Sequence, residues 1–181
     1  MTTTHPTRVV VIGGGILGAS TAAHLARGGA QVTLVTAGSL ADGASGRSIA
    51  WLNSSGDRSA EYHYLRLLAL DRYRTWSVRH PDSRPYLRFD GAMKWAGPGE
   101  SFRETFGFER AGGYDAVWVE RDEIAEVAPD VNPDAVADEG AIFNPGEGWV
   151  SLPDLIAALV DEAMACGARL IEHAGDARVD V

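Results

Sequence analysis

The chain opens with an apolar run of strand length, followed by small residues at helical spacing. Val9 to Ile12 is apolar at every position, which predicts a strand buried on both faces in the middle of a parallel sheet. A helix is predicted up to Arg27, where Gly28-Gly29 ends it, and Gln31 to Val35 predicts a second strand. The order strand, helix, strand predicts an α/β fold with a parallel sheet.

The middle of the chain changes its periodicity twice. Residues 59–80 predict a long amphipathic helix that ends before Pro81, with Leu65, Leu68, Ala69 and Trp76 on its apolar side. From residue 84 onward, short runs between turns predict a mixed α+β region with a short helix near 122–128. Its predicted strands are Tyr86–Phe89, Ala92–Ala96, Ala116–Val119 and Gly140–Phe143.

The helical pattern returns near the end of the chain. Ser151 is a suitable N-cap and Gly167 a suitable stop. The residues between them predict a buried apolar stripe made of Leu155, Ile156, Leu159, Val160, Ala163 and Met164. Ala168 to Glu172 predicts a third parallel strand. These elements predict a Rossmann-type domain in two parts, residues 1–83 and 151–181, around a second domain at 84–150.

The first strand runs directly into a Gly-x-Gly-x-x-Gly turn, which is the fingerprint of a dinucleotide site. Gly13 permits the tight turn, Gly15 lets the backbone approach a pyrophosphate, and Gly18 lets the helix pack close to the strand. The phosphates then lie at the N-terminus of the helix, where the macrodipole favours an anion. The remaining residues of this predicted site are Ile12, Gly14, Ile16 and Leu17.

One part of the fingerprint is absent. The end of the second strand usually carries an acidic residue that binds the adenosine ribose, and this chain has Thr36 there. Replacing a charged hydrogen bond by a neutral one costs about 1–2 kcal/mol, or roughly five- to thirty-fold in affinity. We therefore expect a weakened site in which Thr36 binds one hydroxyl.

Composition narrows the range of partners. The 181 residues carry a net charge of −9, which argues against nucleic acid or an anionic membrane as the main partner. The sequence contains neither a signal peptide nor an apolar run long enough to span a membrane, so a cytoplasmic protein is expected. The histidines are scattered, which predicts no metal site, and Cys166 inside a helix predicts a buried structural thiol.

A second glycine-rich segment, Ala41 to Leu52, follows the second strand. Together with the first glycine turn, it resembles the flavin-dependent amine and D-amino-acid oxidoreductases, a family that includes glycine oxidase, sarcosine oxidase and D-amino-acid dehydrogenase. In that family a similar segment lies beside the FAD cofactor. The resemblance implies that Ala44, Ser45, Gly46 and Arg47 contact FAD, and that Arg47 can also bind a substrate carboxylate.

The resemblance covers nearly the whole chain and implies an FAD-dependent oxidoreductase that oxidises the C–N bond of an amino acid or secondary amine. It implies a backbone contact to adenine near Val179. Family members continue with further strands and most of the substrate-binding residues. We therefore expect this chain to be the N-terminal half of such an enzyme, with no catalytic residue identified and with self-association or the C-terminal half as a partner.

Two other functions remain open from the sequence. The chain could be a non-catalytic nucleotide-binding or interaction fragment. A nicotinamide-dependent dehydrogenase is disfavoured, because the chain has no Tyr-Lys or histidine motif for that chemistry and because the loop Gly43 to Arg47 is typical of flavoproteins.

Overall fold

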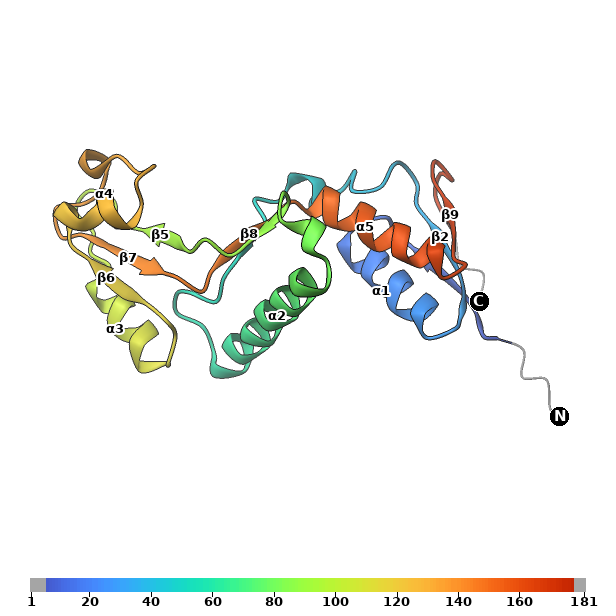
Figure 1. The fold of residues 1–181 in the computed structure, drawn as a ribbon, viewed down its shortest axis with the longest axis horizontal. Helices are drawn as coiled ribbons and strands as arrows, with labels where there is room; N and C mark the ends of the chain where they lie inside the picture. The colour runs from blue at the N-terminus through green and yellow to red at the C-terminus, as the bar shows by residue number, and fades with distance from the viewer. Residues whose placement is uncertain (1–5, 178–181) are drawn as a thin grey trace. The chain divides into compact units, whose positions relative to one another are not determined.

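The computed structural model describes residues 6–177 of the chain, and these form two compact units (Figure 1). The first unit runs to Ala50 and resumes at Ser151, and the second is Trp51–Val150. The sequence placed the first boundary near residue 83, whereas residues 51–83 lie in the second compact unit. That the first unit is the dinucleotide-binding domain stays a prediction.

The first unit is a parallel sheet with helices on one face. Its three strands have the order β1-β2-β9, and both pairings are parallel, so the predicted third parallel strand is confirmed. Figure 1 shows its two helices, α1 and α5, side by side. The elements are β1 (Arg8–Ile12), α1 (Ile16–Arg27), β2 (Gln31–Val35), a 3₁₀ helix (Ala44–Arg47), α5 (Leu152–Ala165) and β9 (Arg169–Ile171).

Small side chains let the two helices of this unit pack closely. The buried face of α1 consists of alanines only, and these side chains lose little conformational entropy on burial. The larger apolar side chains come from α5 and from the middle strand, β2. The core residues of the unit are Ala19, Ala22, Ala23, Ala26, Val32, Leu34, Leu155, Ile156, Leu159, Val160 and Ala163.

The prediction that Val9 to Ile12 is buried on both faces is wrong for the described residues. Val10 is 64% exposed and Ile12 is 52% exposed, because α1 and α5 cover only the opposite face of the sheet. Among residues 6–177, β1 also lies at an edge of its sheet. The most apolar strand of the unit therefore has one open face and one open edge.

The end of α5 corrects two further predictions. Cys166 follows the last residue of the helix and is exposed, because it lies in the turn before Gly167. Met164 was assigned to the buried stripe but is 49% exposed. The other members of the predicted stripe are buried.

The second unit contains two small antiparallel sheets, with the strand orders β3-β8-β4 and β5-β7-β6. The predicted strands between residues 86 and 143 are confirmed, the first three with shorter bounds and the last shifted by one residue. The strands are β3 (Trp51–Leu52), β4 (Leu87–Arg88), β5 (Ala92–Lys94), β6 (Val117–Val119), β7 (Ala141–Asn144) and β8 (Gly148–Val150). The helices are α2 (Ala60–Arg79), α3 (Arg103–Ala111), α4 (Ile124–Val127) and 3₁₀ turns at Pro81–Ser83, Arg121–Glu123 and Pro133–Ala135.

The long helix α2 confirms its predicted bounds to within one residue at each end, and two leucines of its predicted apolar side are exposed. Its N-cap is Ser59, whose hydroxyl accepts a hydrogen bond from the Tyr62 backbone N–H at 3.3 Å. Leu65 and Leu68 are 60% and 44% exposed, because no described element of the second unit covers that side of the helix. The sequence did not predict α3, whose interior contains the helix-disfavouring Gly107.

Two buried glutamates hold the segment that follows β3. The Glu147 carboxylate is fully buried and accepts hydrogen bonds from the indole of Trp51 and the hydroxyl of Tyr114, both at 2.7 Å. The Tyr114 hydroxyl in turn accepts a hydrogen bond from the Ser54 backbone N–H at 2.9 Å. Burial raises the pKa of Glu147, while the hydrogen bonds from Tyr114 and Trp51 oppose this rise.

The second glutamate of this network is Glu109, which is 3% exposed. Its carboxylate accepts a hydrogen bond from the Gly56 backbone N–H at 2.6 Å and pairs with the ammonium of Lys94. The Asn144 amide donates to its second oxygen at 3.3 Å. Buried charges need such partners, because an unpaired carboxylate inside a protein is strongly disfavoured.

Tyr114→Phe tests this network. The substitution keeps the ring but leaves the Ser54 N–H and one Glu147 oxygen without partners, which costs about 1–3 kcal/mol for each buried group. Urea unfolding at neutral pH should show this loss, whereas Tyr64→Phe at a position 63% exposed should change little.

The cost of Tyr114→Phe should depend on pH. Losing the tyrosine hydrogen bond raises the pKa of Glu147 further above its ordinary value of 4.5. Between pH 4.5 and the raised pKa of Glu147, the folded variant binds more protons than the unfolded chain. The free energy of unfolding of the variant therefore falls as the pH rises through this range. A cost independent of pH would mean that the hydroxyl does not serve the Glu147 carboxylate.

Candidate functional site

The turn between β1 and α1 has the geometry that its glycines predict. Gly13 has a φ of +116°, which is a left-handed conformation, and its N–H donates to the Val35 carbonyl at 2.8 Å. A Cβ on Gly18 would lie 1.8 Å from the Gly13 carbonyl oxygen. The helix therefore approaches the turn at a distance that only glycine allows.

The second glycine-rich loop meets the first at the start of α1. The Ser45 hydroxyl accepts a hydrogen bond from the Ile16 backbone N–H at 3.1 Å, and a Cβ on Gly15 would lie 3.1 Å from the same oxygen. Ser45 belongs to the 3₁₀ helix Ala44–Arg47. The structure thus brings together two loops that are separated by about thirty residues in the sequence.

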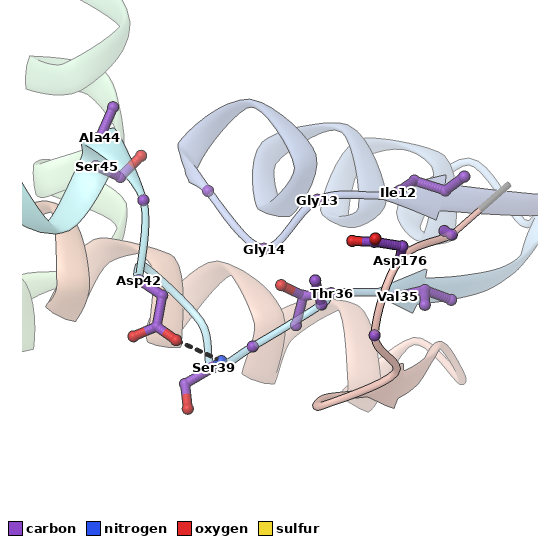
Figure 2. Close-up of a pocket in the computed structure, with 16 residues that line it drawn as sticks. Ile12, Gly13, Gly14, Val35, Thr36, Ser39, Asp42, Ala44, Ser45 and Asp176 are labelled. Carbon is purple, nitrogen blue, oxygen red and sulfur yellow. Dashed lines mark hydrogen bonds between the residues drawn. The ribbon is translucent and has the colours of Figure 1, made fainter.

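A cavity of about 500 Å³ opens beside this junction, at the carboxyl ends of the parallel strands. Ligands of open α/β sheets bind at this end of the strands. Figure 2 shows the cavity between the glycine turn, the end of β2 and the segment that carries Asp42 and Ser45. The first turn of α1 contains no acidic residue that would repel an anion there.

The structure brings seven of the sequence-predicted site residues to this cavity: Ile12, Gly13, Gly14, Gly15, Thr36, Ala44 and Ser45. The others do not line it. Ile16 contributes its backbone N–H to Ser45, Leu17 is 83% exposed, and Gly18 packs against the turn. Gly46 and Arg47 are exposed outside the cavity, and Val179 lies outside the described residues.

Sequence reasoning missed the rest of the lining. Asp42 was part of the second loop but received no role; its carboxylate accepts a hydrogen bond from the Ser39 backbone N–H at 2.8 Å. Residues 175–177, which follow β9, also received no role. The position of these residues after the ends of β2 and β9 is the signal that identifies them. The additional lining residues are Val35, Ala37, Gly38, Ser39, Asp42, Gly43, Gly175, Asp176 and Ala177.

The segment after β9 is held against the end of β2 by backbone hydrogen bonds. The N–H groups of His173, Ala174 and Gly175 donate to the carbonyls of Gly38, Thr36 and Ala37, at 3.2, 3.1 and 3.4 Å respectively. The Glu172 carboxylate also accepts a hydrogen bond from the Leu40 N–H at 2.9 Å. These contacts place residues 175–177 at the cavity wall.

The donor set fits the phosphate and ribose part of a dinucleotide. Glycines at positions 13–15 leave the backbone bare, and Thr36, which is 7% exposed, offers a hydroxyl at the end of β2. Within residues 6–177, no group of three or more metal-ligating side chains gathers. The same residues contain no helix of the length and apolarity needed to cross a membrane; the cytoplasmic location stays a prediction.

Comparisons of sequence and of structure both find glycine oxidases among the similar proteins. Glycine oxidase from Geobacillus kaustophilus strain HTA426 is 30% identical over 179 residues, which is 94% of this chain and 47% of that protein. Its crystal structure has a TM-score of 0.79 at 29% identity over the same shares of the two chains.

More distant structures share the fold. Glycine oxidase from Bacillus cereus has a TM-score of 0.79 at 23% identity, covering 97% of this chain and 49% of that one. L-amino acid deaminase from Proteus vulgaris has a TM-score of 0.73 at 20% identity, covering 93% and 40%.

The chain therefore spans about half the length of the relatives that it matches. The family model described as FAD dependent oxidoreductase matches residues 8–179, which is nearly the whole chain. This chain belongs to the FAD dependent oxidoreductase family.

Proposed function

We propose that this chain binds FAD at the cavity beside the two glycine loops and forms the cofactor-binding part of an enzyme that oxidises the C–N bond of an amino acid or secondary amine. The observation that carries the proposal is the hydrogen bond between the Ile16 N–H and Ser45, because it joins both glycine loops at one cavity. Bound FAD would supply the redox chemistry by accepting a hydride from the carbon that bears the amine.

The residues of this chain would bind and orient the cofactor. Gly13, Gly14 and Gly15 would present bare backbone to the pyrophosphate at the N-terminus of α1. Ser45 keeps the second loop against this turn. Arg47 is exposed beyond the cavity, and its guanidinium group would bind the flavin or a substrate carboxylate through paired hydrogen bonds. The residues that carry out catalysis remain unassigned.

The colour of the purified protein tests the proposal. Protein incubated with FAD and passed through a desalting column should retain flavin absorbance, whereas a parallel sample with NAD should retain no nucleotide. A colourless protein that binds NAD alone would contradict the flavin assignment. A protein that binds FAD but never oxidises glycine, sarcosine or D-alanine in any assembly would indicate a nucleotide-binding protein without catalysis.

Gly15→Val tests the position of the pyrophosphate. The new Cβ would lie 3.1 Å from the Ser45 hydroxyl, and its branches would occupy the space that the phosphates need. Fluorescence titration should show loss of FAD binding, while circular dichroism shows unchanged helix content. Gly107→Val is the matched control, because a Cβ there meets open space in α3. Unchanged FAD affinity in a folded Gly15→Val variant would move the site elsewhere.

We also propose that the open edge and face of β1 bind the polypeptide that corresponds to the C-terminal half of the longer relatives. The edge offers unpaired backbone groups, and Val10 and Ile12 add apolar area. Without that polypeptide, the same surface favours self-association of this chain.

Val10→Lys tests this surface. A lysine on the open face of an edge strand opposes pairing with another chain, so the variant should elute as a monomer where the parent chain self-associates. Val78→Lys, at a position 82% exposed on α2, is the control and should leave the elution unchanged. Size-exclusion chromatography with light scattering gives both results. A parent chain that is already a monomer would contradict the proposal.

A further inference from the structure

The wall of the cavity contains a carboxylate, that of Asp176, which forms no bond that holds the described part of the fold. Asp176 lines the cavity, is exposed, and within residues 6–177 accepts no hydrogen bond and forms no ion pair. Figure 2 shows its carboxylate directed toward the space between the glycine turn and Thr36. The only other acidic side chain among the lining residues, Asp42, is bonded to the Ser39 N–H at 2.8 Å.

The position of Asp176 is set by backbone hydrogen bonds of the residues that precede it. The three preceding residues are hydrogen-bonded to the carbonyls of residues 36–38, so the chain leaves β9 along the end of β2. Thr36, at that end, is the position where the dinucleotide fingerprint usually has its acidic residue. Asp176 and Thr36 therefore line the same end of one cavity, although they lie 140 residues apart in the sequence.

We propose that Asp176 supplies the carboxylate that binds the adenosine ribose hydroxyls, in place of the acidic residue that is absent at position 36. The inference rests on the proposed dinucleotide site. With the pyrophosphate at the glycine turn, the ribose lies next along the cavity toward the strand ends, where the Asp176 carboxylate can accept hydrogen bonds from hydroxyl groups. The site thus regains a charged acceptor from the segment that follows a different strand, β9.

The test compares two nucleotides that differ only in the ribose hydroxyls. Isothermal titration calorimetry of the full chain with ADP and with 2′,3′-dideoxy-ADP measures what the hydroxyls contribute. The parent chain should prefer ADP by about tenfold or more, since hydrogen bonds to a charged group are the strong ones. Asp176→Asn should lose most of this preference, through weaker ADP binding relative to the dideoxy nucleotide.

Asp42→Asn is the matched control, because it removes the same charge from the same cavity and keeps an acceptor for the Ser39 N–H. It should shift both affinities together and leave the preference for ADP intact. This comparison separates a specific contact from a general change in repulsion between the cavity and phosphate.

The outcomes separate the inference from the proposed function. If ADP binds, Gly15→Val abolishes that binding, and Asp176→Asn keeps the full preference for ADP, then the role of Asp176 is overturned while the dinucleotide site stands. A preference lost in Asp42→Asn instead would assign the ribose to Asp42. If the parent chain binds neither nucleotide, both the inference and the dinucleotide site are overturned.

Discussion

The cavity depends on one close approach between α1 and the turn that precedes it. Gly18 lies so near the Gly13 carbonyl that a Cβ would meet the oxygen at 1.8 Å. This approach sets the position of the N-terminus of α1, and the Ile16 N–H at that end donates a hydrogen bond to the Ser45 hydroxyl. The positions of the second loop, the cavity wall and the bare backbone at Gly15 therefore all depend on the absence of a Cβ at Gly18.

The second unit uses a different constraint, which is the satisfaction of buried charge. Glu147 accepts a hydrogen bond from the indole of Trp51, and Glu109 accepts one from the Gly56 N–H. The Tyr114 hydroxyl donates to Glu147 and accepts from the Ser54 N–H, so it links these two residues. The short segment after β3 is too irregular to hold itself by its own backbone pairing. Buried carboxylates replace that pairing, and each hydrogen bond in turn makes the burial of the carboxylate tolerable.

The first unit exposes apolar surface that its own described residues leave uncovered. Both helices lie on one face of the sheet, so the alternation of β1 places Val9 and Val11 toward them and Val10 and Ile12 away. An apolar run without alternation is typical of strands covered on both faces. The mismatch between this run and its observed exposure is consistent with a second polypeptide covering the open face.

The sequence by itself determined the features that depend on neighbouring residues. The glycine turn, the helix after it and the strand bounds near Gln31 to Val35 follow from local conformational preference and from side-chain period. The resemblance carried by its glycine-rich segment also predicted Ser45 as a site residue, and Ser45 lines the cavity. These properties need no knowledge of what the segments contact.

Only the tertiary structure decided which distant residues share a surface. It placed Cys166 and Met164, which were both predicted to be buried, at exposed positions, because burial depends on which neighbouring elements cover a residue. It also placed Asp176 at the same cavity as Thr36, since the pairing of β9 with β2 joins segments that the sequence separates widely. The local sequence pattern predicts that a segment is a strand. Long-range packing and hydrogen bonding determine which strand it pairs with and in which register.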